Sequence, residues 1–334
     1  MNPKPIMLFG MPRSGTTWIG KIFDSHPDTL YRHEPDSWGL LNDIPLLPPK
    51  ENTAQYAPII DGFIASIPRM NKTKVSATMP VFRKNYYSPL QFWLLNLNIR
   101  TSKLLGKVFG EVGTPQFIDY RSGKNIRLVW KSIESLGRLG VIAQRDCSAI
   151  HLVRHPCGYI SSVLRGESKS KFTSSTPTSD DFELFEMLLH TEKAIELGLT
   201  LEQLKQMTAI ERLAWRWVLF NEKAYNDTRG MKNCMLSLYE DFCDDPEGSA
   251  RRLFEFCGLD WHPQVAGFLQ NSTASENSSY YSVFKDPKKS ANKWQNELSD
   301  QEISAIMKIA STSEVGRLYL SDIPHTITLP NAAV

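Results

Sequence analysis

The first residues whose types and spacing suit chemistry are 10–18, GMPRSGTTW, which follow the apolar run PIMLF. Gly10 and Gly15, with Thr16 and Thr17 behind them, have the outline of a phosphate-binding loop, in which backbone N–H groups and a helix N-terminus hold an anion. The usual loop has a lysine where Thr16 stands, and here Arg13 lies inside the loop instead. A kinase or ATPase would lose its main γ-phosphate contact, so we expect the loop to bind phosphate for another purpose. A glycine turn between a strand and a helix is the alternative.

A second candidate anion site lies in the middle of the chain, in SAIHLVRHPCGYISSVLRG. Arg154 ends the apolar strand AIHLV, and Pro156 suits the first turn of a helix whose second turn carries Ser161 and Ser162. A guanidinium and a hydroxyl in these positions would converge on one phosphate. Taken alone, an arginine after a strand is more often a surface ion-pair residue, so this prediction depends on the pairing of the two elements.

Both elements resemble motifs of the sulfotransferases that use 3′-phosphoadenosine-5′-phosphosulfate (PAPS). PRSGTTW is similar to their 5′-phosphosulfate loop, P-[KR]-[ST]-G-T-[TS], and the second stretch is similar to their 3′-phosphate element, an arginine followed eight residues later by a serine (162 − 154 = 8). LSLYEDFCDDPEGSARRLFEFCGLDWHP and SANKWQNELS resemble later segments of the family. The resemblance covers roughly residues 5–35, 125–165 and 210–300, and its motifs are closest to the carbohydrate and tyrosylprotein branches.

The resemblance implies which residues bind the donor. The early loop would hold the 5′-phosphosulfate and Arg154 with Ser162 the 3′-phosphate. Trp18 would stack on adenine, although its place in the helix stripe makes a core role nearly as good a reading. Lys293, beside Lys288, Lys289 and Trp294, would contact the 3′-phosphate, unless it is only a solvated charge. The predicted donor-binding residues are Arg13, Ser14, Gly15, Thr16, Thr17, Trp18, Arg154, Ser162 and Lys293.

Three residues are candidates for the chemistry. By analogy with phosphoryl transfer, the transition state should be loose, so the protein mainly positions the reactants and supplies positive charge. Arg13 is the first candidate for that charge and Lys131, at the end of the strand IRLVWK, the second, with a solvated lysine as the alternative. Glu34 is the preferred base because it lies 21 residues after Arg13 (34 − 13 = 21), which matches the catalytic glutamate of the tyrosylprotein branch. If this segment is extended, the substitute base His33 points to the opposite side.

The elements that must position these residues form an alternating pattern. The runs PIMLFG, NIRLVWK, SAIHLVR and NCMLSLY predict strands, each followed by a helical pattern or a loop, and this predicts a three-layer α/β fold with a largely parallel central sheet and a P-loop-like nucleotide-binding core. We expect helices over 16–25 and over DPEGSARRLFEFCG, where Asp245 is the N-cap and Gly258 the end. The chain, 1–334, is predicted to be a single domain. Residues 36–100 are expected to be an insertion, either an acceptor-binding cap or a packed excursion, and 166–181 a loop that could act as a lid.

Composition excludes several other classes of protein. With 38 basic and 36 acidic residues the net charge is +2, which does not favour a nucleic-acid polymer as partner. No stretch is apolar for long enough to span a membrane, and no signal peptide is recognised, so we expect a cytoplasmic protein. Five cysteines without CxxC spacing argue against a disulfide framework and a zinc site, so no metal is expected.

The sequence therefore predicts a PAPS-dependent O-sulfotransferase. It would move a sulfuryl group to a hydroxyl of a carbohydrate, a lipid or another small molecule. The alternatives are an atypical P-loop phosphotransferase, which would consume ATP with magnesium, and a non-catalytic nucleotide-binding protein. The sequence leaves the acceptor and the oligomeric state open; the aromatic residues in 79–93 suit a sugar, a lipid, a phenol or simply a core.

Overall fold

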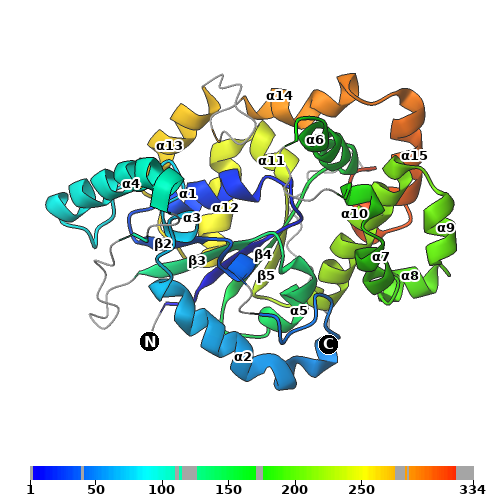
Figure 1. The fold of residues 1–334 in the computed structure, drawn as a ribbon, viewed down its shortest axis with the longest axis horizontal. Helices are drawn as coiled ribbons and strands as arrows, with labels where there is room; N and C mark the ends of the chain where they lie inside the picture. Colours follow the sequence, from blue (N-terminus) through cyan, green and yellow to red (C-terminus); the bar gives the residue numbers. More distant parts are fainter. Residues whose placement is uncertain are drawn as a thin grey trace.

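A five-stranded sheet forms the centre of the molecule (Figure 1). The structure is a computed structural model that describes residues 3–38, 41–109, 113–114, 126–170, 176–274, 283 and 286–320. All strand pairs are parallel, in the order β2-β3-β1-β4-β5. The strands are β1 (Ile6–Phe9), β2 (Thr29–His33), β3 (Arg127–Ser132), β4 (Ser148–Val153) and β5 (Cys234–Leu238). The four strands predicted from sequence are confirmed, and β2 adds a fifth at one edge.

Side chains alternate between the two faces of the sheet, and each face is covered by helices, which confirms the three-layer α/β prediction. Along β1, Ile6 and Leu8 belong to one core cluster, whereas Met7 and Phe9 belong to the other. Because both faces are buried, the strands are apolar throughout rather than alternating with polar residues. This is the pattern that made PIMLF recognisable as a strand.

The helices divide between these two clusters. The Ile6–Leu8 cluster includes residues of α1 (Thr16–Ser25), α11 (Tyr239–Asp244), α12 (Pro246–Cys257), α13 (Pro263–Thr273) and α14 (Pro287–Asn292). The Met7–Phe9 cluster includes residues of α2 (Thr53–Ser66), α5 (Leu139–Ile142), α6 (Pro156–Ser168), α7 (Phe182–Leu188), α8 (Glu192–Glu196), α9 (Leu201–Gln206), α10 (Ala209–Thr228), α15 (Asp300–Ala310) and α16 (Glu314–Arg317). The described residues also form the helices α3 (Thr73–Ser76) and α4 (Pro89–Phe109) and 3-10 turns at Pro35–Trp38, Lys50–Asn52, Ile67–Arg69, Leu136–Arg138, Thr178–Asp180 and Lys293–Asn296.

Two predicted helix boundaries have clear local causes. α1 begins directly after Gly15, whose φ of 92° lies in the left-handed region that glycine adopts at low cost. At α12 the Asp245 side chain accepts a hydrogen bond from the Gly248 N–H (2.9 Å), and Gly258, with φ of 62°, ends the helix. Both helices have the bounds that the sequence predicted.

The segment 36–100 contains α2, α3 and the start of α4. Phe63 of α2 packs edge-on against Trp130 of β3, with ring centroids 4.9 Å apart. Lys84 donates to the carbonyl oxygens of Asp24 and His26, so this segment also holds the end of α1. Its predicted contact with an acceptor stays a prediction. Of the predicted lid at 166–181, residues 171–175 lie outside the described residues.

Within the described parts of the chain, no helix combines the length and the apolar character that a membrane span requires.

Candidate active site

The loop between β1 and α1 is crowded by backbone and by an aromatic ring. A side chain at Gly15 would overlap the Tyr239 ring, and one at Gly10 would overlap the carbonyl oxygen of Leu152. Ser14 is 2% exposed, and its hydroxyl has no hydrogen-bond partner among the described residues. A buried hydroxyl in this state is costly unless a ligand or water satisfies it. The loop therefore has the form of an anion cradle, with the N-terminus of α1 behind it.

The two sequence-predicted anion elements meet through Arg13. Its Nε donates to the hydroxyl of Ser162 (3.1 Å), and its carbonyl oxygen accepts from Nη1 of Arg154 (3.0 Å). The early loop lies 149 residues from Ser162 in sequence, yet parallel β1 and β4 are neighbours, so their carboxyl ends lie at one sheet edge. The structure thus brings together the loop, Arg154 and Ser162.

Arg154 is a buried cation whose direct contacts are neutral. It is 8% exposed, its Nη2 donates to the carbonyl oxygen of Ser290 (2.9 Å), and its guanidinium lies over the Tyr239 ring, 5.0 Å from the centroid. Its Nε is buried without a partner among the described residues. A guanidinium that is fixed in place but lacks a contacting carboxylate is prepared to bind an added anion.

The C-terminal segment of 286–297 packs against α6. The Trp294 ring stacks on His155, with centroids 4.6 Å apart and planes 6° apart, and Glu297 accepts hydrogen bonds from Ser161 and Arg165. Lys293 is exposed beside this stack. The segment therefore lies beside Arg154 and the start of α6, and contact of Lys293 with a 3′-phosphate stays a prediction.

Trp18 lies in the core, close to the loop. It is 8% exposed, its indole N–H donates to the Ser272 hydroxyl (3.2 Å), and its ring meets Tyr239 edge-on at 6.1 Å. These contacts correspond to the core alternative, and adenine stacking stays a prediction. Of the two threonines, Thr16 is buried and Thr17 is half-buried at the first turn of α1.

Glu34 and Lys131 form an ion pair at the carboxyl ends of β2 and β3. Lys131 is 1% exposed and donates to Oε1 of Glu34, and the Glu34 N–H donates to the Lys131 carbonyl oxygen (2.8 Å). Burial lowers the pKa of Lys131, and the Glu34 carboxylate opposes that shift. The solvated-lysine alternative does not hold, because the ammonium is buried and paired. The two candidate side chains are therefore in direct contact.

The expectation that His33 and Glu34 point to opposite sides is wrong. Glu34 has φ of 48°, so the strand has ended and the chain turns, which places Oε1 of Glu34 3.5 Å from Nε2 of His33. Nδ1 of His33 pairs with the Tyr31 hydroxyl at 2.9 Å. Burial, and then the charges of Lys131 and Lys21, lower the pKa of His33 to about 2. His33 is therefore neutral at physiological pH.

Two residues of this region were missed by the sequence interpretation. Tyr239 fills the space beside Gly15 and under Arg154; its position in LSLYEDF was noticed only as part of the resemblance. Asp36 accepts hydrogen bonds from Trp130 Nε1 (3.2 Å) and from the hydroxyls of Ser132 and Ser135 (2.5 Å for Ser135), which fixes the end of β3. Its only sequence signal was its place two residues after Glu34.

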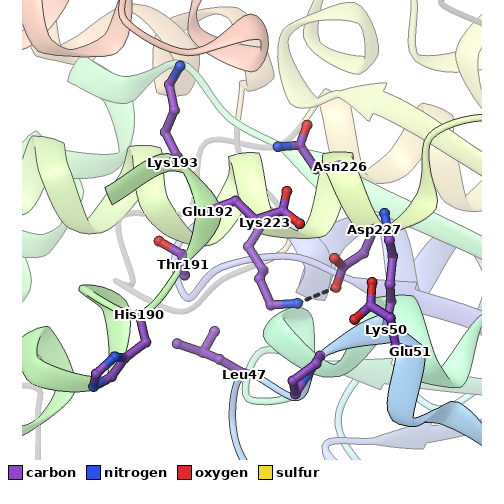
Figure 2. Close-up of a pocket in the computed structure, with 11 residues that line it drawn as sticks. Leu47, Lys50, Glu51, His190, Thr191, Glu192, Lys193, Lys223, Asn226 and Asp227 are labelled. Atoms are coloured by element: carbon purple, nitrogen blue, oxygen red, sulfur yellow. Dashed lines mark hydrogen bonds and ion pairs between the residues drawn. The ribbon is translucent and has the colours of Figure 1, made fainter. Parts of the chain in front are cut away.

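A cavity of about 120 Å³ lies away from these residues, between the 47–51 segment, the start of α8 and the end of α10 (Figure 2). Lys223 donates to Asp227 and to the carbonyl oxygen of Pro48 (2.9 Å) there. Burial raises the pKa of Asp227, and Lys223 opposes the shift. The cavity contains none of the predicted site residues. Its ion pair lies within α10, and the hydrogen bond from Lys223 to Pro48 connects that helix to the 47–51 segment. Among the described residues no group of His, Cys, Asp or Glu is placed to hold a metal ion.

Comparisons with known proteins agree with the motifs. Residues 5–263 match the model described as the sulfotransferase family, Sulfotransfer_3. Comparison with curated proteins gave no significant match. Among solved structures, the chain is similar to the sulfotransferase domain of the Synechococcus PCC 7002 olefin synthase (16% identity, 97% of each chain, TM-score 0.45). It is also similar to the sulfotransferase domain of the curacin biosynthetic pathway (18% identity, 96% of this chain and 99% of that chain, TM-score 0.46) and to mouse sulfotransferase SULT7A1 complexed with PAP (12%, 96% and 89%, TM-score 0.45).

Proposed function

The chain belongs to the sulfotransferase family, and on that premise we propose that it transfers a sulfuryl group from PAPS to an acceptor hydroxyl and releases adenosine 3′,5′-bisphosphate. One observation carries the choice of donor: Arg13 touches both Ser162 and Arg154, so two anion-binding elements form one continuous surface. A donor with a phosphate at each end of its ribose suits such a surface.

The residues present fit that donor. The buried Ser14 hydroxyl and Nε of Arg154 both lack partners among the described residues, and ligand oxygens would satisfy them. Crowding at Gly10 and Gly15 leaves room there only for backbone, which lets N–H groups approach an anion. We assign the loop to the 5′-phosphosulfate, and Arg154 with Ser162 to the 3′-phosphate.

Glu34 is the proposed base, and Lys131 is proposed to supply positive charge in the transition state. As the acceptor oxygen bonds to sulfur, its proton passes to Glu34, and the bond from sulfur to the bridging oxygen of the donor breaks. Lys131 and Arg13 would stabilise the charge that gathers on the donor side. Neutral His33, with its pKa lowered to about 2, is a weak proton acceptor, which favours Glu34.

An acceptor-panel assay, with a parallel incubation in ATP and magnesium, tests the proposal. Purified protein is incubated with labelled PAPS and a panel of glycans, lipids, phenols and tyrosine peptides, and products are detected by mass. We expect one acceptor class to gain a sulfuryl group without added magnesium. Magnesium-dependent ATP consumption would instead identify a phosphotransferase, and nucleotide binding without any product would indicate a binding protein.

A further inference from the structure

Helix α4 has apolar residues on two opposite faces, and only one of them is covered. Leu95 and Ile99 are buried and pack with Ala77. Leu90, Trp93, Leu94 and Leu97 follow the spacing i, i+3, i+4, i+7 and therefore form a second stripe on the other face of the helix. This exposed stripe, residues 90, 93, 94 and 97, is 65%, 59%, 37% and 45% exposed in that order.

The exposed stripe is unusual for this molecule. Nine large apolar side chains among the described residues are exposed, and five of them lie between 79 and 97, the fifth being Met79. Figure 1 shows α4 as the cyan helix at the left margin, outside the layers that cover the sheet. Clustered exposed apolar side chains mark interaction sites more often than scattered ones do.

The charged residues of the sequence segment that contains the stripe have one sign. From residue 62 to residue 110 the sequence has eight basic residues, Arg69, Lys72, Lys74, Arg83, Lys84, Arg100, Lys103 and Lys107, and no acidic residue. The rest of the chain holds 30 basic residues (38 − 8 = 30) against all 36 acidic ones, a net charge of −6. Arg69, Lys72, Lys74, Arg83 and Arg100 are exposed, and Arg100 continues the row of Trp93 and Leu97 along the helix.

A basic helix with exposed tryptophan and leucine has the chemistry of an interfacial membrane helix. The apolar stripe would enter the boundary between headgroups and acyl chains, and the basic side chains would meet anionic headgroups. A second copy of the chain fits less well, because pairing two α4 regions would bring like charges together. We propose that the α4 face docks the protein on an anionic lipid membrane surface. This inference is independent of the proposed sulfuryl transfer.

Vesicle co-sedimentation tests the inference. We expect the full chain to sediment with vesicles of phosphatidylcholine and phosphatidylserine, to bind vesicles of phosphatidylcholine alone more weakly, and to lose affinity as salt is added. The double variant Trp93→Ser/Leu97→Ser should bind on the order of tenfold more weakly or worse, because two inserted side chains are lost. Arg83→Glu/Arg100→Glu should weaken binding by a similar factor, and more strongly at low salt.

Matched controls separate docking from general effects. Ile195→Ser removes a 67% exposed apolar side chain on α8, and Lys232→Glu reverses an exposed charge before β5; neither should change sedimentation. Thermal melting should be unchanged in the α4 variants, because the substituted side chains are exposed. Failure of the wild-type chain to bind either vesicle, or equal binding by the α4 variants, would overturn the inference. If the wild-type chain dimerised without lipid and Trp93→Ser/Leu97→Ser abolished the dimer, the inference would be overturned, and the stripe would instead bind a second copy of the chain.

Discussion

Two buried cations lie at the carboxyl edge of the sheet, and they are partnered differently. Lys131 contacts a carboxylate, that of Glu34, and the two groups neutralise each other. Arg154 contacts two carbonyl oxygens and an aromatic ring, and one of its N–H groups has no partner among the described residues. Both side chains are less than one-tenth exposed, so burial alone does not distinguish them.

The difference indicates different tasks. A buried charge is tolerated only when it is paired or well hydrogen-bonded, and Lys131 already meets that condition. In the proposed mechanism these two groups act during the reaction, Glu34 as the base and Lys131 as a source of positive charge. Arg154 is buried without a contacting carboxylate and has an N–H group without a partner among the described residues, which is consistent with its proposed role in binding an anion. Substitutions at the Lys131–Glu34 pair should therefore lower turnover, whereas substitutions at Arg154 and the early loop should weaken nucleotide binding.

The largest effect should come from Glu34→Gln. Loss of the base should lower kcat by about 10²- to 10⁴-fold while adenosine 3′,5′-bisphosphate affinity stays nearly unchanged, because Glu34 is not assigned to the donor. Steady-state kinetics and a titration with the nucleotide would measure the two quantities. Full retained activity would exclude Glu34 as the base.

The substitution also leaves Lys131 buried without its partner, which lowers stability. Asp227→Asn is the matched control, since it removes the carboxylate of another buried lysine–carboxylate pair, Lys223–Asp227, which is drawn in Figure 2. Its melting temperature should fall as well, because a buried ammonium again loses its partner. Its kcat, measured below the melting transition, should match the wild-type value; an equal loss of kcat in both variants would show that instability explains the result.

A smaller effect is expected from Gly15→Ala, which tests the proposed nucleotide-binding loop next to Arg154. A side chain at φ of 92° is strained and would overlap the Tyr239 ring beside Arg154, so stability should fall by about 1–3 kcal/mol. Nucleotide affinity should fall as well, because Tyr239 and Arg154 must shift. Urea unfolding and nucleotide titration measure both.

Gly62→Ala provides the contrast, because Gly62 occupies an exposed position of helix α2 and a side chain there would meet no atom within 4 Å. We expect it to raise stability by up to about 1 kcal/mol, since alanine favours a helix. If Gly15→Ala also raised stability and left nucleotide affinity unchanged, the close packing of the loop against Tyr239 would not be needed for folding or for nucleotide binding.

The last comparison concerns the pH dependence of stability. Burial and the Arg154 charge lower the pKa of His155 to about 4, as His33 beside Lys131 is lowered to about 2. The unfolded chain takes up these protons near pH 6.5, so it binds more protons than the folded chain below that pH, and stability is lost as pH falls from about 6.5. The free energy of unfolding should drop by up to about 1.4 kcal/mol per pH unit for each histidine.

Urea unfolding between pH 7 and pH 5 measures this slope. His155→Gln and His33→Gln should each reduce it, whereas His190→Gln, at an exposed position, should leave it unchanged. If the slope of unfolding free energy against pH were the same in the wild type and both variants, His33 and His155 would not have lowered pKa values in the folded chain.

The sequence predicted the elements that depend on local pattern. The four apolar runs are strands because both sheet faces are buried, and Asp245 and Gly258 bound α12 through backbone geometry that short polar residues and glycine satisfy locally. The motif spacing also predicted that the early loop and Arg154 would cooperate, because parallel strands bring their carboxyl ends together. β2 was less evident, since TLYRH contains polar residues inside the sheet edge.

Contacts that depend on packing could not be read from the pattern. Extended geometry predicted that His33 and Glu34 diverge, yet the left-handed turn at Glu34 brings them together. Trp18 was assigned to adenine or to the core because helix periodicity does not distinguish them, and the surroundings of the ring are shown by its contacts with Ser272 and Tyr239. The burial of Lys131 likewise depends on β2 and β3 being neighbours, which no local signal gives.

Calorimetric titration with adenosine 3′,5′-bisphosphate is the most direct test of the central claim, that the early loop and Arg154 grip one doubly phosphorylated adenosine. We expect one site per chain in the wild type and affinity about 10- to 100-fold weaker in Arg154→Ala, the range expected for a lost charge-assisted contact. Arg251→Ala, which removes an exposed arginine paired with Glu247, should bind like the wild type. A folded wild-type protein that gives no heat of binding, or an Arg154→Ala variant with unchanged affinity, would contradict the account.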